Sequence, residues 1–277
     1  MDPNSQQMDL SLLNYFFHIS LTGETEHVVL EMPATDLLKK ERMDEVIQVS
    51  GDLMKAIGTE LPASFVGMGF FGVSASVQLV LATYNRLLDL SLSNLTFQVQ
   101  PHDDHVHSCF RINELKYKEA PTDPEERQAW LVEELTAFYR DTVRPVIEMA
   151  AVSAGVKPDL VWSQYGARMA YAVDYMEGVE KRPEVLVRFR ADYETLARVL
   201  PPELFGRRRN PFDHKPRYID SPYDAGKKLM MRSACCMYDR RENGEKCYNC
   251  PMMLPEEREE RRRRIEATRE KPGEQPA

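Results

Sequence analysis

Helical periodicity dominates the pattern of hydrophobic and polar positions along the chain. Apolar residues recur at intervals of three and four, which predicts amphipathic helices, over residues 8–19, 41–58, 123–154, 158–177 and 190–200. The segment from Asp123 has the clearest pattern, because Pro124 and the acidic pair Glu125-Glu126 suit a first helical turn. Pro145 should kink or break this helix, since proline lacks the N–H that the helix ladder needs.

A run without any charged residue extends from Leu61 to Asn85. It is long enough to cross a bilayer, but it carries serines, a glutamine, a proline and three glycines, which are unusual on a surface that faces lipid. A buried core helix over about residues 63–88 is therefore predicted instead of a membrane span.

The same run contains Gly67-x-Gly69-x-x-Gly72, the spacing of a dinucleotide-binding loop. That loop requires a hydrophobic strand directly before it, and only Phe65-Val66 is available there. The pattern indicates glycines that allow close helix packing, and it gives no support for reduction by a bound nicotinamide.

A second polar cluster, His102-Asp103-Asp104-His105-Val106-His107, leads into Cys109. It is interpreted as a polar turn that joins strands at about 94–100 and 106–116. Strand alternation would place His105, His107 and Cys109 on one face, where they could ligate iron or zinc. Cys109 is otherwise a small buried residue or part of a substrate site, and the sequence leaves these alternatives open.

These elements predict an α+β fold in which a helix-dominated N-terminal domain contains a small antiparallel sheet. Three parts are expected: a substrate-binding domain over residues 1–205, a loop-rich domain over 206–255, and a charged helix with a disordered tail over 256–277. The helix is supported by acid-first pairs such as Glu257 with Arg261. It is interpreted as a solvated helix, with a docking arm for an electron donor as the alternative.

Composition and charge exclude some classes of function. The net charge of −8 argues against a general nucleic-acid binder. The first twenty residues lack a basic start and a small-residue cleavage site, so a cytoplasmic location is expected. The charge is unevenly spread, because residues 205–250 carry a net +5 and the remainder carries −13.

Four of the five cysteines lie within this basic region: Cys235, Cys236, Cys247 and Cys250. Four thiolates so close together most economically hold a metal ion or an iron-sulfur cluster. A disulfide framework is the weaker interpretation, because the cysteine total is odd and the group is a single tight one.

The spacing favours a binuclear cluster over zinc. Cys247 and Cys250 form a Cys-x2-Cys pair that suits either metal. Adjacent residues such as Cys235 and Cys236 point in different directions, which makes them awkward ligands for one zinc ion. Two irons relax this demand, and Pro251 after the last cysteine is similar to ferredoxin runs that end in Cys-Pro. Structural zinc remains the alternative.

The arrangement Cys-Cys-x10-Cys-x2-Cys near the C-terminus resembles that of the FhuF-type ferric-siderophore reductases. Arg232 and the run Met237-Tyr238 resemble the residues that flank the adjacent cysteines in that family, and Asn210-Pro211-Phe212 resembles its Asn-Pro segment. Trp162-Ser163-Gln164 through Ala167 is similar to a Trp-Gly-Asn-x-Ala helix start, with Ser163 and Gln164 replacing the glycine and the asparagine.

The resemblance implies a cytoplasmic oxidoreductase in which the four cysteines hold a 2Fe-2S cluster. Its substrate would be iron(III) bound by a hydroxamate, catecholate or citrate-type siderophore, and its donor a ferredoxin or similar reductase system. Ferrous iron binds such oxygen chelators weakly, so one electron would release the metal. Two alternatives remain: a zinc-stabilised interaction protein, and a 2Fe-2S carrier or sensor without a small-molecule substrate.

Basic residues around the cysteines have a possible use under this hypothesis, because a 2Fe-2S cluster with four thiolates carries negative charge and nearby positive charge tunes its potential. They would also steer an anionic ferric complex. Ordinary surface charge is the simpler interpretation. The candidates are Arg207, Arg208, Arg209, Lys227, Lys228 and Arg232.

Overall fold

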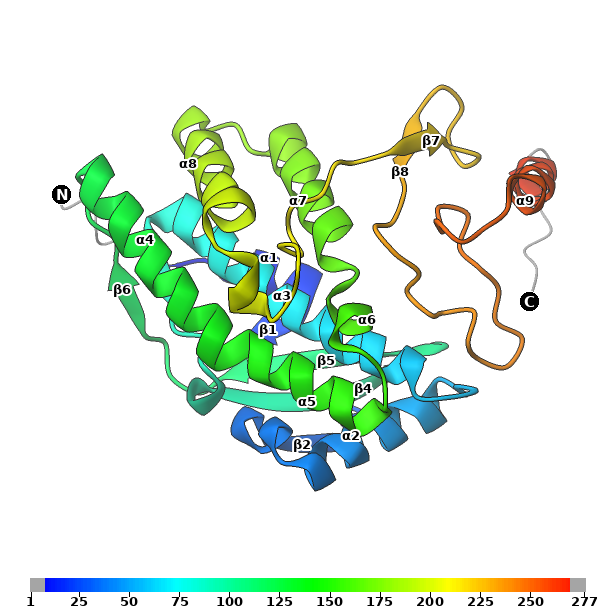
Figure 1. The fold of residues 1–277 in the computed structure, drawn as a ribbon, viewed down its shortest axis with the longest axis horizontal. Helices are drawn as coiled ribbons and strands as arrows, with labels where there is room; N and C mark the ends of the chain where they lie inside the picture. Colours follow the sequence, from blue (N-terminus) through cyan, green and yellow to red (C-terminus); the bar gives the residue numbers. More distant parts are fainter. Residues whose placement is uncertain (1–7, 270–277) are drawn as a thin grey trace.

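The computed structural model describes residues 8–269, and the predicted disordered tail over 271–277 lies outside them. The described chain is a helix-rich α+β fold, as predicted, with a loop-rich C-terminal segment and a final helix at one end (Figure 1). The helices are α1 (Ser11–Phe17), α2 (Lys40–Leu53), α3 (Glu60–Tyr84), α4 (Pro124–Phe138), α5 (Arg144–Ala154), α6 (Pro158–Trp162), α7 (Tyr165–Val179), α8 (Pro183–Glu194) and α9 (Pro255–Arg269).

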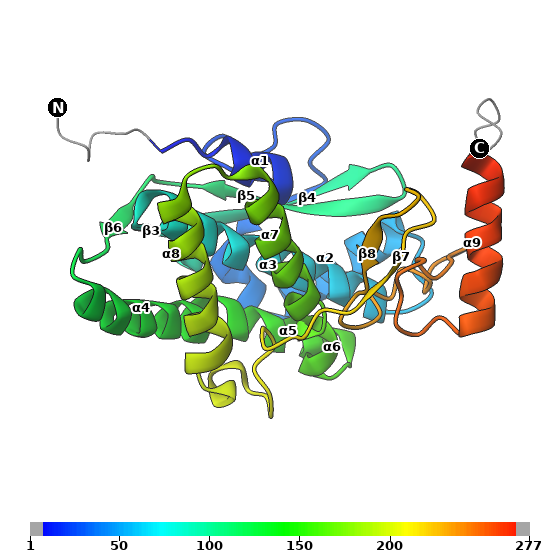
Figure 2. The same ribbon diagram turned by 90° about the horizontal axis from the view of Figure 1, so that it is seen from above.

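Helix α3 forms the centre of the fold, and the main sheet and six helices pack around it, namely α1, α2, α5, α6, α7 and α8 (Figures 1 and 2). By length and composition it could span a membrane, but 83% of its most apolar window is buried inside the protein. The predicted core helix is therefore confirmed, with bounds three to four residues earlier than expected. It ends at Asn85, which adopts a left-handed conformation.

The glycines of α3 allow close packing, as their spacing indicated. A Cβ atom at Gly67 would lie 2.6 Å from the backbone oxygen of Val161 at the end of α6. At Gly69 it would lie 2.5 Å from the Cβ of Ser108 on the sheet. No hydrophobic strand leads into these glycines, since they lie inside the helix. The dinucleotide-binding interpretation is thus excluded here.

The main sheet has the order β1-β5-β4-β2 and packs against α3. Its strands are β1 (Ile19–Ser20), β2 (Leu30–Pro33), β4 (Leu95–His102) and β5 (His105–Ile112). The predicted hairpin is confirmed: β4 pairs antiparallel with β5, and only Asp103 and Asp104 separate them. Strand β1 was predicted as part of a helix over 8–19, but α1 ends at Phe17 because His18 turns left-handed. Ile19 then pairs parallel with β5.

The long helix predicted over residues 123–154 is present as α4, a π-helical turn (Tyr139–Val143) and α5. Asp123 caps it by accepting hydrogen bonds from the backbone nitrogens of Glu125 and Glu126, both at 3.0 Å. The π-turn ends at Val143, just before the Arg144-Pro145 start of α5, as expected where a proline cannot continue the regular ladder. Gly155 ends α5 with a φ of 65°.

Further short elements complete the fold. Helix α8 begins at Pro183, earlier than the predicted residue 190, because Pro183 suits a first helical position. The remaining strands form two small antiparallel ladders, β3 (Arg86–Leu88) with β6 (Tyr117–Glu119) and β7 (Tyr218–Asp220) with β8 (Lys228–Met230). The other turns are η2 (Ala34–Leu38), η3 (Leu92–Asn94), η4 (Tyr139–Val143, the π-turn above), η5 (Thr195–Val199, also a π-turn) and η6 (Pro202–Phe205).

Core packing continues past residue 205. Phe212 is fully buried in an aromatic group, with ring centroids 5.5 Å from both Tyr139 and Tyr165 and 5.8 Å from Phe205. Asn210 supports this turn by donating hydrogen bonds to the carbonyls of Leu196 and Leu200. The division into three parts stays a prediction, and residues 206–212 pack with the helical core.

Candidate cluster site and adjoining pocket

Residues 231–254 form a loop that carries all four clustered cysteines, and an isolated β-bridge between Arg241 and Ala56 is its only ladder contact within the described chain. Local turns shape it: the backbone nitrogen of Cys250 donates to the carbonyl of Cys247 at 2.9 Å. Met237 adopts a φ of 60°, which reverses the chain after the adjacent cysteines. The loop therefore folds back and brings sulfurs from both pairs together.

The sulfur positions fit a metal cluster. The Sγ atoms of Cys236 and Cys247 lie 3.8 Å apart. Two thiolates on one tetrahedral metal with bonds of about 2.3 Å would be separated by about 3.8 Å. Cys235 and Cys250 also interact electrostatically. The four sulfurs do not, however, form one group whose members all lie within 4.8 Å, although two other side-chain groups in the described chain do.

Thiol chemistry at the site is asymmetric. The pKa of Cys236 is lowered to about 6, because its sulfur accepts a hydrogen bond from the Cys247 thiol and has Arg232 and Arg168 nearby. The same hydrogen bond raises the pKa of Cys247. Burial raises the pKa of Cys235 to about 12. One sulfur is thus ready to bind metal as a thiolate, and the others would release their protons to water when the metal binds.

Two arginines place positive charge beside these sulfurs. Arg232 precedes the cysteines, and Arg168 reaches them from α7. Neither forms an ion pair with a carboxylate of the described residues, and the Nε atom of each is buried without a hydrogen-bond partner. Burial and the neighbouring Arg232 lower the pKa of Arg168 to about 10. A buried cation without an anion is costly, and a negatively charged cluster would compensate this pair.

The other basic residues proposed as contributors lie elsewhere or are engaged with acids. Arg207 forms an ion pair of 2.8 Å with Asp159. Lys227 pairs with Asp224 at 2.6 Å, and Lys228 pairs with Asp220. Arg208 and Arg209 lie between η6 and β7 in the sequence, well before the first cysteine of the loop. Of the six candidates, Arg232 is the one with a resolved interaction with a cysteine.

The start of α7 holds the cysteine loop in place. The Gln164 side chain donates to the carbonyl of Ala234 at 2.7 Å. Ser233 donates through Oγ to the carbonyl of Ser163 at 2.6 Å and accepts from the backbone nitrogen of Ala167 at 3.3 Å. The segment Trp162 to Ala167, noted above for its resemblance to a helix start, therefore contacts the residues just before Cys235.

Residues 232–251 match the model of the FhuF 2Fe-2S C-terminal domain. This stretch, residues 232–251, is called the FhuF segment below. The motif of that domain is fitted by four cysteines, which form a 2Fe-2S site: Cys235, Cys236, Cys247 and Cys250. The match begins at Arg232, the arginine that faces Cys236. No curated protein matches the chain.

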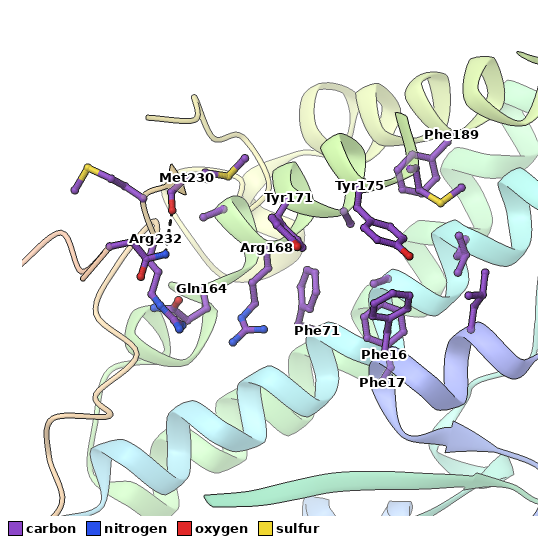
Figure 3. A pocket seen from close by; sticks show the side chains of 18 residues that line it. Phe16, Phe17, Phe71, Gln164, Arg168, Tyr171, Tyr175, Phe189, Met230 and Arg232 are labelled. Atoms are coloured by element: carbon purple, nitrogen blue, oxygen red, sulfur yellow. Dashed lines mark hydrogen bonds between the residues drawn. The ribbon is translucent and has the colours of Figure 1, made fainter. Parts of the chain in front are cut away.

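A cavity of about 310 Å³ adjoins the FhuF segment. Figure 3 shows aromatic rings at one end of it and Arg168, Gln164 and Arg232 at the other. The aromatic wall comes from α1, α3, α7 and α8 and consists of Phe16, Phe17, Phe71, Tyr171, Tyr175 and Phe189. The pocket thus joins an apolar chamber to the two arginines beside Cys236.

Sequence reasoning did not find this pocket or Arg168. Arg168 lies on α7, far from the cysteines in the chain, within an ordinary helical pattern. Its guanidinium is placed by packing, since Nη2 lies 2.6 Å from the sulfur of Met68 and the group lies over the Phe71 ring. A lone arginine between Ala167 and Met169 is the one local signal of its unusual position.

The β4–β5 hairpin also reaches the FhuF segment. The Arg241 Nη1 atom lies 2.9 Å from the Asp104 carboxylate and 2.8 Å from the Tyr238 hydroxyl. The Asp104 carboxylate also accepts a hydrogen bond from Tyr238, and this bond contributes most to lowering the pKa of that carboxyl. Figure 2 shows the hairpin extending toward β7, β8 and the cysteine loop. Cys109 is buried in the sheet, and burial raises its pKa to about 12.

Helix α9 follows the FhuF segment and is attached to it. Arg258 donates to the carbonyls of Cys250 and Tyr248 at 2.7 and 3.2 Å. Lys246 pairs with Glu257, and Arg264 pairs with Glu245. The predicted charged helix is therefore confirmed, and its first turn supports the last cysteine.

Proposed function

We propose that this FhuF-type iron-sulfur protein is a ferric-siderophore reductase. The observation that carries the proposal is the continuity between the aromatic pocket and the cluster site. Arg168 and Arg232 line the pocket, and the same two arginines act on the sulfur of Cys236. A ligand in the pocket would therefore lie against the residues that surround the cluster.

The pocket has the chemistry to hold an anionic ferric complex or one arm of it. Its aromatic side chains offer flat apolar surfaces, with Phe16 and Tyr175 in an edge contact at 5.0 Å. The guanidinium groups of Arg168 and Arg232 would orient oxygen anions at the inner end. Hydroxamate, catecholate and citrate-type complexes all present such oxygens around iron(III), so these three classes are proposed as substrates.

The chain's own residues have defined tasks in this scheme. When bound, the cluster supplies one electron at a time. Arg168 and Arg232 hold positive charge next to Cys236, and this charge stabilises the reduced form of the cluster. Gln164 and Ser233 fix the loop against α7, so that the distance from the pocket to the sulfurs does not vary. No nucleophile or general base is required, because the reaction makes and breaks no covalent bond of the organic ligand.

We propose a ferredoxin or similar reductase system as donor and the cytoplasm as location. Assembly of the cluster requires cysteines that are reduced and able to bind iron as thiolates, which suits a reducing compartment. Helix α9, with its row of arginines and glutamates beside the FhuF segment, offers a charged surface for a donor.

Iron release under turnover tests the function. Reduced protein would be supplied with each ferric-siderophore class under anaerobic conditions, with a ferrous-specific chromogenic chelator as the trap. Tyr175→Ser should raise KM several-fold while the cluster spectrum is unchanged, because it removes an aromatic wall of the pocket. Tyr117→Ser is the control, since Tyr117 lies on β6 and does not line the pocket. A carrier or sensor would release no ferrous iron from any of the three classes.

A further inference from the structure

The tip of the β4–β5 hairpin gathers three imidazoles. His102 and His105 face each other in the strand register across the two-residue turn, and His107 lies two residues further along β5. One ring nitrogen from each of the three lies within 4.8 Å of the others. The hairpin alone brings them together, so their proximity follows from a short-range turn rather than from a long-range contact.

The ring geometry resembles that of metal ligands. The Nε2 atoms of His105 and His107 lie 3.1 Å apart. Two imidazole nitrogens on one metal with bonds of about 2.0 Å would be separated by about 3 Å. A hydrogen bond between the two rings is the other interpretation of this distance, and it would use one N–H and leave the third histidine unexplained.

Carboxylates lie behind two of the rings. The Nδ1 atom of His105 is 3.4 Å from Asp104, on the side of the ring opposite to Nε2. The Nδ1 atom of His102 is 3.6 Å from Asp103. Metal-bound histidines commonly present their second nitrogen to a carboxylate in this way, which fixes ring orientation. His18 stacks on His107 with centroids 3.9 Å apart and forms one wall of the group.

We propose that His102, His105 and His107 bind a divalent first-row transition metal ion. Three neutral imidazoles suit zinc, iron(II), cobalt or nickel, whereas magnesium and calcium prefer oxygen ligands. The exposed ring of His102 leaves the remaining coordination positions open to water. A second group of ligand-type side chains, His18, Glu24 and Cys109, is less suitable because Cys109 is fully buried in the sheet.

The site is tied to the FhuF segment. Asp104, which lies behind His105, pairs with Arg241 and Tyr238 of that segment. Phe65 lies between them, with its ring 6.3 Å from both Tyr238 and His105. A role for this histidine site in accepting ferrous iron released from the siderophore rests on the proposed function. Metal binding itself does not.

The test uses cluster-loaded protein and zinc as the probe. Equilibrium dialysis against micromolar Zn²⁺, followed by elemental analysis, should give one zinc per chain with unchanged iron and an unchanged visible spectrum. His102→Ala and His107→Gln should each weaken zinc binding by more than about tenfold. His214→Gln is the control, because His214 lies against Gly166 on α7, away from the hairpin.

Three outcomes would overturn the proposal: no zinc uptake by the wild type, unchanged uptake in both hairpin variants, or equal loss in His214→Gln. His102 is exposed, so His102→Ala remains informative even if His107→Gln fails to fold. Anaerobic dialysis against Fe²⁺ then tests the link to iron release. A protein that binds zinc but releases no iron from siderophores would retain the metal site and contradict the proposed function alone.

Discussion

The sulfur of Cys236 lies 3.8 Å from the sulfur of Cys247 and accepts its thiol hydrogen bond. This contact joins the adjacent pair to the Cys-x2-Cys pair, and a turn with a positive φ at Met237 follows the adjacent cysteines. The arrangement is what a cluster with ligands from both pairs requires.

Replacing a cysteine should therefore remove the cluster. Cys236→Ser is expected to reduce bound iron and sulfide from about two each per chain to near zero, with loss of the brown colour. Cys109→Ala is the matched control and should keep its full cluster, because Cys109 lies in the sheet. Iron and sulfide analysis with visible absorbance measures both. A fully loaded Cys236→Ser protein, or a colourless zinc-containing wild type, would contradict the assignment.

The sequence predicted the cluster segment because its signal is local. Four cysteines at fixed spacing specify their chemistry without knowledge of the fold, and the uncharged run from Leu61 marked the core helix for the same reason. Arg168 and the pocket could not be predicted, since they depend on how α1, α3, α7 and α8 pack together. Strand β1 has only two residues and a parallel partner far along the chain, so it carries no periodic signal.

Positive charge at Arg168 should raise the reduction potential of the cluster. Arg168→Met preserves much of the side-chain volume and removes the charge, so the added electron becomes less favourable. Removing one positive charge from beside the cluster should change the free energy of reduction by about 1 kcal/mol, which is on the order of 50 mV for one electron. A redox titration followed by visible absorbance should show the potential shifted downward by this amount.

Lys227→Met is the control for this experiment, because Lys227 is exposed and paired with Asp224. Its effect should be much smaller than that of Arg168→Met. Equal shifts in the two variants would show that the basic segment acts as diffuse surface charge. An unchanged potential in Arg168→Met would show that Arg168 does not influence the cluster.

Close packing of α3 depends on Gly67. A methyl group there would lie 2.6 Å from the Val161 carbonyl oxygen, a backbone atom that cannot move without shifting α6. Gly67→Ala should lower the free energy of unfolding by about 1–3 kcal/mol in urea denaturation. Gly178→Ala, in an open part of α7 with nothing within 4 Å, should raise it by up to about 1 kcal/mol. Destabilisation of similar size in both variants would refute the packing argument.

Part of the loss of folding stability at low pH should arise from Glu180. Its carboxylate accepts hydrogen bonds from the Arg182 side chain and from the backbone nitrogens of Lys181 and Arg182, and its pKa is lowered to about 2, mainly by the Arg182 side chain. Since the ordinary pKa is 4.5, the folded state gains stability above about pH 5 and loses it as the pH falls toward 2.

Glu180→Gln should accordingly lower the free energy of unfolding by on the order of 1 kcal/mol at pH 7. The difference from wild type should shrink below pH 4.5 and vanish near pH 2. Urea denaturation at several pH values measures it, with Glu133→Gln at an exposed position of α4 as the control. A difference that is independent of pH would mean that the charge of Glu180 has no part in it.

The most direct test of the central claim is a single reoxidation. The dithionite-reduced protein, freed of excess reductant under anaerobic conditions, is mixed with a stoichiometric ferric siderophore while cluster absorbance is followed by stopped flow. The account predicts full recovery of the oxidised spectrum with at least one siderophore class, with one ferrous ion formed per cluster and slower recovery in Tyr175→Ser than in Tyr117→Ser. A reduced cluster that stays bleached with hydroxamate, catecholate and citrate-type complexes alike would contradict it.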